Sequence, residues 1–188
     1  MDTIPTLQSE RLTLRAFTLT DAPAVQFILN DREITDYMLY IPYPCSVEWV
    51  EQYIQRVNQD APTGRYTFGI VRREEDTIIG RINIRVNADH QRAEIGYWVG
   101  RVFWGQGFAS EAARRIIQFG FDDLGLNRVM GQCFARNAAS ARVLEKAGMR
   151  YEATFRDDFL KNGVYETTHV FGILRAEYLI ASGTIRNT

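Results

Sequence analysis

Residues 93–112 read AEIGYWVGRVFWGQGFASEA, and this stretch decides the fold. Its first eight residues are typical of a strand, and a long amphipathic segment typical of a helix follows the glycines Gly105 and Gly107. A helix N-terminus exposes unpaired N–H groups and a partial positive charge, and glycine lets an anion approach the backbone closely. The stretch therefore indicates an anion site, although the same glycines also fit a plain strand-to-helix turn.

Two common phosphate-binding motifs do not fit this stretch. The Walker pattern GxxxxGK[ST] is absent because no lysine follows the glycines. The Rossmann pattern is incomplete, since position 110 is serine, and the preceding strands look like an antiparallel meander rather than the opening of a βαβ unit. Nucleotide binding of those two kinds is therefore not expected.

Toward the N-terminus the periodicity predicts strands and two helices. Strands are expected at 11–17, 65–73, 77–86 and 93–100, and helices at 18–31 and 46–59. The residues of the first helix expected to face the core are Val25, Phe27, Ile28 and Leu29. Ser46 is the expected N-cap of the second helix, after a loop broken by Pro42 and Pro44. The later strands are joined by very short connections, which implies antiparallel neighbours.

Toward the C-terminus the pattern alternates between helix and strand. The helix that follows the glycines is expected to close at Gly125, and another helix starts at Asn137 and stops at Gly148. Strands are expected at 128–134, 149–160 and 164–174, the last two joined by an Asn-Gly turn. The predicted fold class is α+β, with a central, mixed, mostly antiparallel sheet of about seven strands flanked by helices.

The composition is that of an ordinary globular protein. The chain has 188 residues, 46% of them hydrophobic and 24% charged, and a net charge of −1. This balance excludes a general affinity for nucleic acid or an anionic membrane, and no apolar run approaches the ~20 residues of a membrane span. The N-terminus lacks a signal-peptide pattern, so a cytoplasmic protein is expected. Cys45 and Cys133 are expected to be idle thiols, and the isolated His90 and His169 predict no metal site.

A second motif lies at residues 137–149, which read NAASARVLEKAGM. Asn137 is the expected N-cap, with Ser140 one turn in and basic residues around it, a pattern that taken alone also fits a plain cap and a solvated face. Together the two motifs resemble the Gcn5-related N-acetyltransferase (GNAT) family, and within it the RimJ/RimL-like branch of ribosomal-protein N-terminal acetyltransferases. The resemblance runs from residue 9 to residue 179. It implies the GNAT fold in one N-acetyltransferase domain over 1–188, with a core at about 8–180.

The resemblance implies acetyl-CoA as the acetyl donor. The family's phosphate loop, [QR]xxGx[GA], falls on residues 104–109, where Gly107 and Ala109 match and Trp104 replaces the usual Gln or Arg. Trp104 in place of Gln or Arg weakens phosphate binding little if backbone N–H groups bind the phosphates. The N–H groups of residues 105–110 are then expected to hold the pyrophosphate.

Other donor contacts follow from the same resemblance. The strand at 96–100 is expected to pair with the pantetheine arm where the sheet splays, and Asn137 to bind near the amides of that arm. Arg142 or Lys146 is expected to meet the adenosine-side phosphates. The implied donor-binding residues are Tyr97, Trp98, Val99, Trp104, Gly105, Gln106, Gly107, Phe108, Ala109, Ser110, Asn137, Arg142 and Lys146. The N–H of Val99 is the candidate oxyanion donor.

Acetyl transfer to an amine needs a base for the amine, and the departing thiolate benefits from an acid. Glu94 is the candidate base, although it also fits an ordinary strand carboxylate paired with Arg92 or Arg81. Many relatives place a tyrosine acid seven residues after the asparagine, and that position is Leu144 here. Ser140 is therefore the candidate acid, although a serine in the first turn of a helix also fits a bond to its own backbone.

The amine acceptor is the least determined partner. Four aromatic residues are expected to wall its groove, unless they pack in the core: Tyr37, Tyr40, Tyr43 and Trp49. The favoured acceptor is the N-terminal α-amine of a protein. A small amine, such as an amino acid, a polyamine or an aminoglycoside, is the alternative acceptor, because a cationic acceptor favours an acidic pocket. The acidic residues that could form one are Asp31, Glu33, Asp36, Asp157 and Asp158. A non-catalytic module that binds acyl-CoA is an alternative to an enzyme. The oligomeric state is expected to be either a monomer or a homodimer.

Overall fold

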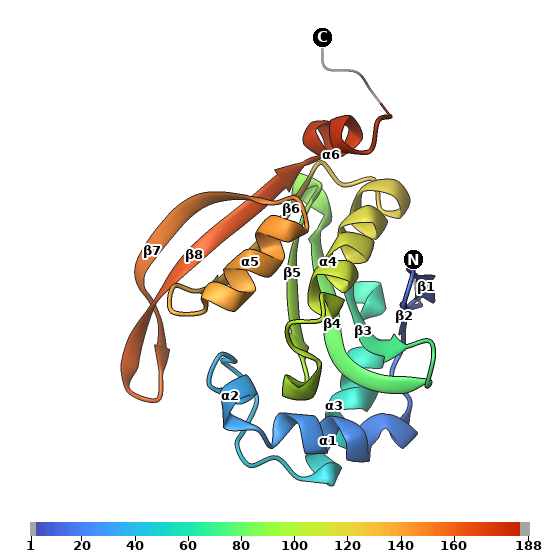
Figure 1. The fold of residues 1–188 in the computed structure, drawn as a ribbon, viewed down its shortest axis with the longest axis vertical. Coiled ribbons are helices and arrows are strands. Elements are labelled where there is room, and N and C mark those ends of the chain that lie inside the picture. The colour runs from blue at the N-terminus through green and yellow to red at the C-terminus, as the bar shows by residue number, and fades with distance from the viewer. Residues whose placement is uncertain (1–2, 185–188) are drawn as a thin grey trace.

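Eight strands form one open sheet in the computed structural model, which describes residues 3–184 (Figure 1). Their order in the sheet is β1-β2-β3-β4-β5-β6-β8-β7. The strands are β1 (Leu7–Gln8), β2 (Leu12–Arg15), β3 (Arg65–Arg72), β4 (Thr77–Asn87), β5 (Arg92–Val99), β6 (Arg128–Phe134), β7 (Arg150–Lys161) and β8 (Val164–Leu174). The strand that sequence periodicity missed is β1, because two residues cannot show an alternation. Residues 1–2 and 185–188 of the predicted domain lie outside the described residues.

Helices lie against both faces of this sheet. They are α1 (Ala22–Leu29), α2 (Arg32–Thr35), α3 (Val47–Gln59), α4 (Phe108–Gln118), α5 (Ala138–Lys146) and α6 (Arg175–Ala181). The predicted α+β class with a mixed sheet is confirmed, and α2 and α6 are additions that the sequence did not predict. Within residues 3–184 no helix has the length and apolar character needed to cross a membrane.

The sheet opens into a gap between β5 and β6. These two strands run parallel and pair from Arg92↔Arg128 to Ile95↔Gly131, and no described residue extends the pairing further. Their remaining halves, residues 96–99 and 132–134, diverge without pairing. The predicted splay is therefore present, and the predicted antiparallel neighbours β3, β4 and β5 are confirmed on one side of it.

Two hydrophobic cores hold the helices against the sheet. One core joins α4 and α5 to Ile82, Ile84 and Ile95, and the other joins α1 and α3 to Trp98 and Val71. Burial of each such side chain contributes roughly 1.5–3 kcal/mol. In Figure 1, α1, α2 and α3 gather at one end of the sheet, beside the open end of the gap.

Helix ends follow the local sequence signals closely. Ser46 caps α3 through a hydrogen bond from the Trp49 amide at 3.2 Å, and Gly148 has the positive φ of 95° expected where α5 stops.

The prediction that Phe27 faces the core is wrong, since it is 79% exposed. Ala22, Val25 and Leu29 already fill the inner stripe of α1, and Phe27 stands two residues off that stripe.

Candidate active site

The loop between β5 and α4 exposes a row of backbone amides. Gly105 and Gly107 have φ angles of 75° and 83°, which favour a residue without a Cβ. In the described part of the chain, the N–H groups of residues 105–110 donate to no backbone or side-chain acceptor. Such unpartnered N–H groups at a helix start fit a pyrophosphate. The side chains of Phe108 and Ser110 are buried, so only their backbone is available to it.

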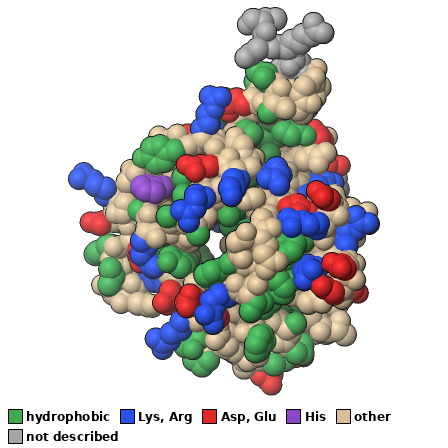
Figure 2. All heavy atoms as spheres, viewed as in Figure 1, with side chains coloured by type: hydrophobic (Ala, Val, Ile, Leu, Met, Phe, Trp, Pro, Cys, Tyr) green, Lys and Arg blue, Asp and Glu red, His purple; other side chains and the backbone are tan. Residues whose placement is uncertain are grey.

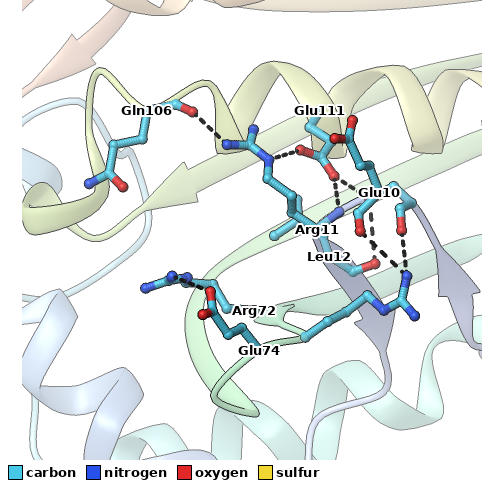
Figure 3. Close-up of polar contacts among 9 residues, drawn as sticks. Glu10, Arg11, Leu12, Arg72, Glu74, Gln106 and Glu111 are labelled. Atoms are coloured by element: carbon cyan, nitrogen blue, oxygen red, sulfur yellow. Dashed lines mark hydrogen bonds and ion pairs between the residues drawn. The ribbon is translucent and has the colours of Figure 1, made fainter.

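Arg11 holds this loop in place from β2's side, as Figure 3 shows. Its Nη1 donates to the Gln106 carbonyl at 3.1 Å, and its Nε donates to Glu111 Oε2 at 2.7 Å. Glu111, only 7% exposed, also accepts hydrogen bonds from the Arg11 amide and the Ser9 hydroxyl. Burial alone would raise the pKa of Glu111, but these hydrogen bonds outweigh it and leave that pKa below its usual value.

β5 lines one side of the gap with free backbone groups. The Gly100 N–H donates to the Ile79 carbonyl on β4 at 2.8 Å. Successive residues of a strand turn their N–H and C=O groups to opposite edges, so Tyr97 and Val99 turn theirs toward the gap. Trp104 Nε1 donates to the Val99 carbonyl at 2.7 Å, which leaves the Val99 N–H as a donor there. This geometry suits the pairing with pantetheine and the oxyanion role expected of Val99.

α5 lines the other side of the gap at its N-terminus. Asn137 caps this helix as predicted, because its Oδ1 accepts from the Ser140 N–H at 3.0 Å, and its side-chain NH₂ stays available to a ligand. The Ser140 hydroxyl lies 2.8 Å from Tyr97 Oη, and Tyr97 Oη donates to the Ser140 carbonyl at 3.0 Å. The candidate acid is therefore paired with a phenol from the opposite strand.

Cys133 and two basic side chains flank Ser140. Cys133 is buried, and burial raises the pKa of its thiol to about 11, although a hydrogen bond with Ser140 opposes the rise. A buried thiol that keeps its proton agrees with the idle role expected for it. Arg142 and Lys146 are exposed one turn apart on α5, where they are free to meet phosphates.

Glu94 occupies the paired half of β5, just before the gap. Its carboxylate forms an ion pair with Arg85, with Nη2 and Oε2 2.6 Å apart. The alternative partners Arg92 and Arg81 are wrong, because Arg85 is the residue opposite Glu94 in the register of β4 and β5. The next residue on the same face of β5 is Gly96, and the Asn83 side chain of β4 lies over it, with Oδ1 3.0 Å from where a Cβ would stand.

Two of the four predicted acceptor-binding aromatics contact other side chains of the described chain. Trp49 stacks on Tyr53 with the ring centroids 5.6 Å apart and packs against the second core, as its core alternative predicted. Tyr43 lies under the guanidinium of Arg32 at 4.7 Å.

Tyr37 lies in a small pocket at the open end of the gap, whereas Tyr40 is 85% exposed. The pocket is lined by Glu33, Asp36, Tyr37, Trp104 and Arg136. Arg136 pairs with Glu166, donates to the Asp36 carbonyl at 2.8 Å and covers the Tyr37 ring at 4.7 Å. Glu33 pairs with Arg101 at 3.4 Å, whereas the Asp36 carboxylate has no ion pair among the described residues, so Asp36 is the carboxylate of this pocket left to meet a cation.

The β7–β8 hairpin closes the open end of the gap against α2. Its Lys161 Nζ donates to the carbonyls of Met38 at 2.6 Å and Thr35 at 3.1 Å. Figure 1 shows the hairpin reaching down beside α2, and Figure 2 shows a hollow near the centre of the same view. The hairpin and α2 thus meet at one end of the gap and form its rim there.

Asp158 stands at the point where β5 and β6 separate. Its Oδ2 accepts from Gln132 Nε2 at 2.5 Å and from Thr168 Oγ1 at 2.6 Å, and Gln132 is the first β6 residue past the last pair with β5. A bulge in β7 between Phe155 and Phe159 brings it there. The sequence marked Asp158 only as one of several acids, since no local pattern reveals a bulge.

The chain is similar in sequence and in fold to known acetyltransferases. The family model described as "Acetyltransferase (GNAT) domain" matches residues 11–150. "Uncharacterized N-acetyltransferase p20" of Bacillus licheniformis is 35% identical over 175 residues, which cover 92% of this chain and 98% of that protein. A crystal structure of a GNAT-family acetyltransferase from Bacillus anthracis is 26% identical, has a TM-score of 0.82 and covers 92% of this chain and 99% of its own.

Two more distant relatives carry names that specify an acceptor. "Putative ribosomal N-acetyltransferase YdaF" of Bacillus subtilis is 27% identical and covers 90% of this chain and 94% of its own. "Spermidine N(1)-acetyltransferase" of Vibrio cholerae is 26% identical and covers 91% of this chain and 97% of its own.

Among the described residues, no group of three or more His, Cys, Asp or Glu side chains is arranged to hold a metal ion.

Proposed function

We propose that this chain, which belongs to the GNAT family and is an acetyl-CoA-dependent N-acetyltransferase, acts on the α-amine at the N-terminus of a protein. The observation that carries the proposal is the gap between β5 and β6, with free backbone on β5, Ser140 on α5 and Glu94 just before the opening. In this proposal the amine attacks the thioester directly in a ternary complex. Glu94 receives the proton of the amine, and Ser140 protonates the departing thiolate.

The protonation state of the acceptor favours an α-amine. An α-amine has a pKa of about 7.7–8.0, so roughly a tenth of it is neutral at pH 7, whereas less than about 0.1% of a lysine is neutral. The Glu94 carboxylate forms an ion pair with the Arg85 guanidinium. A carboxylate is a weak base, and a weak base suffices for an amine that is already partly neutral. The ribosomal name of the Bacillus subtilis relative supports the same acceptor class, and such an acceptor places the enzyme in the cytoplasm.

A small cationic amine is the second candidate acceptor. The pocket at the open end of the gap carries Asp36, whose carboxylate has no ion pair among the described residues, and Glu33, which pairs with Arg101 at 3.4 Å. The charge of Asp36 suits an ammonium group. The spermidine-acetylating relative supports this candidate. Both candidates share the donor, the gap and the two proposed catalytic groups.

An acceptor panel separates the two candidates. Release of free thiol from acetyl-CoA is measured with peptides that have free N-termini, the same peptides with blocked N-termini and an internal lysine, polyamines and an aminoglycoside. We expect turnover on the free N-termini and none on the blocked peptides. Turnover on polyamines alone contradicts the α-amine and selects the second candidate.

Two variants test the catalytic groups in the same assay. Glu94→Gln and Ser140→Ala are each expected to lower kcat about a hundredfold while the Kd for acetyl-CoA, measured by calorimetry, stays within about threefold. Glu74→Gln, an exposed carboxylate outside the gap, is the matched control and is expected to keep wild-type kcat. Unchanged kcat in Glu94→Gln removes Glu94 as the base.

A further inference from the structure

We propose that Tyr97 is a positioning residue for acetyl transfer, which directs the Ser140 hydroxyl toward the departing thiolate of CoA. The proposal rests on the proposed function, because it takes Ser140 as the acid. Tyr97 was expected to contribute only backbone contacts to the donor. Its side chain gives it a second part in the reaction.

The hydrogen bond between these residues spans the gap. Tyr97 lies on β5 two residues beyond Ile95, the last residue paired with β6, and Ser140 lies in the first turn of the helix that follows β6. Oη and Oγ are 2.8 Å apart. Among the described residues, the only side-chain hydrogen bonds that join the unpaired half of β5 to α5 are those between Tyr97 Oη and Ser140. Tyr97 therefore holds the Ser140 hydroxyl from the β5 side of the gap, while the Cys133 thiol contacts it from β6.

The number of hydrogens fixes how the pair works. A phenol has one hydrogen, and Tyr97 Oη has two acceptors for it: the Ser140 carbonyl at 3.0 Å and the Ser140 hydroxyl at 2.8 Å. While the phenol donates to the carbonyl, the serine hydroxyl donates to the phenol. When the serine donates to a thiolate instead, the phenol is free to turn its hydrogen to Ser140 Oγ.

The step balances as follows in atoms and charges. The bond between the acetyl carbon and sulfur breaks, and its electron pair stays on sulfur. The Ser140 O–H bond breaks as the S–H bond forms, and the negative charge on Oγ is stabilised by the hydrogen bond from Tyr97. The acetyl carbon is now bonded to the amine nitrogen, and water carries the proton that Glu94 took from that nitrogen to Ser140 after the thiol leaves. Tyr97 donates a hydrogen bond throughout and does not itself lose its proton.

The surroundings keep the phenol neutral, and α5 has no tyrosine that could take its place. Burial raises the pKa of Tyr97, with the hydrogen bond to Ser140 opposing the rise. Leu144, at the position where many relatives have a tyrosine, is 1% exposed and packs against Gly131 of β6. The phenol in this chain therefore reaches the gap from β5 rather than from α5.

A double-mutant cycle tests the proposal with Tyr97→Phe, Ser140→Ala and the two changes combined. Each enzyme is assayed for kcat and KM on the acceptor identified by the panel, and for its Kd for acetyl-CoA by calorimetry. We expect Tyr97→Phe to lower kcat about tenfold, with KM and Kd within about threefold of wild type. The combined variant should be no slower than Ser140→Ala alone, because the phenol acts through the serine.

The matched control is Tyr178→Phe, which removes a phenol hydrogen bond to Asp122 on the surface. It is expected to keep wild-type kcat, and thermal unfolding of every variant verifies that each is folded. Full kcat in Tyr97→Phe, or losses that multiply in the combined variant, overturns the proposal. Full kcat in Ser140→Ala instead overturns the acid role assigned to Ser140, so the two failures are distinguishable.

Discussion

The buried carboxylate of Glu111 anchors Arg11, which in turn contacts the loop between β5 and α4. We call this loop, residues 104–107, the donor loop, because we propose that it binds acetyl-CoA. Glu111→Gln keeps the shape of the side chain but removes the charge that accepts from the Arg11 guanidinium and amide and from Ser9. We expect the variant to lose about 1–3 kcal/mol of unfolding free energy at pH 7, measured by urea denaturation. Glu10→Gln, an exposed neighbour, should change this free energy by less than about 0.5 kcal/mol.

The same residue predicts how stability depends on pH. Because the pKa of Glu111 is lower in the folded than in the unfolded protein, its contribution is fully present above the unfolded value of about 4.3. That contribution is lost as the pH falls through the lower, folded value. Urea denaturation from pH 7 down to pH 3 should therefore show a shallower decline for Glu111→Gln than for wild type. Equal slopes for the two proteins would contradict the assignment.

Residues whose roles are set locally were predictable, and those set by distant contacts were not. The caps formed by Ser46 and Asn137 follow from side chains and the helix that starts beside them. The bond from Tyr97 to Ser140 joins residues 43 positions apart, and the bond from Arg11 to Glu111 joins residues 100 apart. No periodicity within either segment contains that information, and only the packed sheet brings those side chains together.

Among the elements, the start of α4 is the one whose backbone conformation we propose to serve donor binding. Gly107 has a φ of 83°, and Gly125, beyond the other end of the same helix, has a φ of 65°. Alanine at either position should cost about 1–2 kcal/mol of unfolding free energy, because a Cβ is unfavourable at positive φ. Only Gly107→Ala is expected to raise the Kd for acetyl-CoA, by about tenfold or more, since only there do free amides face the donor.

Calorimetry and thermal unfolding on both glycine variants check this prediction together. Gly125→Ala serves as the matched control, because it carries the same backbone cost without touching the donor loop. An equal rise of Kd in both variants would mean that lost stability, rather than the loop, weakens donor binding.

The elements themselves were predictable from the sequence where they were long, as β8 was. The short helix α2 was not predictable, because one helical turn beside a proline-broken loop shows no periodicity.

For the molecule as a whole, Lys161 joins the hairpin to α2 across the rim of the gap. Lys161→Met keeps the length of the side chain but removes the donors to the Met38 and Thr35 carbonyls. We expect KM for the acceptor to rise severalfold while the Kd for acetyl-CoA stays unchanged, because the donor side of the gap does not involve this contact. Hydrogen exchange should become faster at residues 35–40. Unchanged exchange there would show that α2 holds its place without the lysine.

The break in pairing between β5 and β6 divides the sheet into two parts that four residue pairs join, Arg92↔Arg128 to Ile95↔Gly131. A molecule seated between the parts touches both, so its binding free energy adds to the cohesion of the protein. At a donor concentration 100 times its Kd, this linkage is worth about 2.7 kcal/mol. For a chain of this size that amounts to a rise of roughly 5–10 °C in the unfolding temperature. A melting curve can therefore rank acetyl-CoA against longer acyl-CoAs before any amine acceptor has been found.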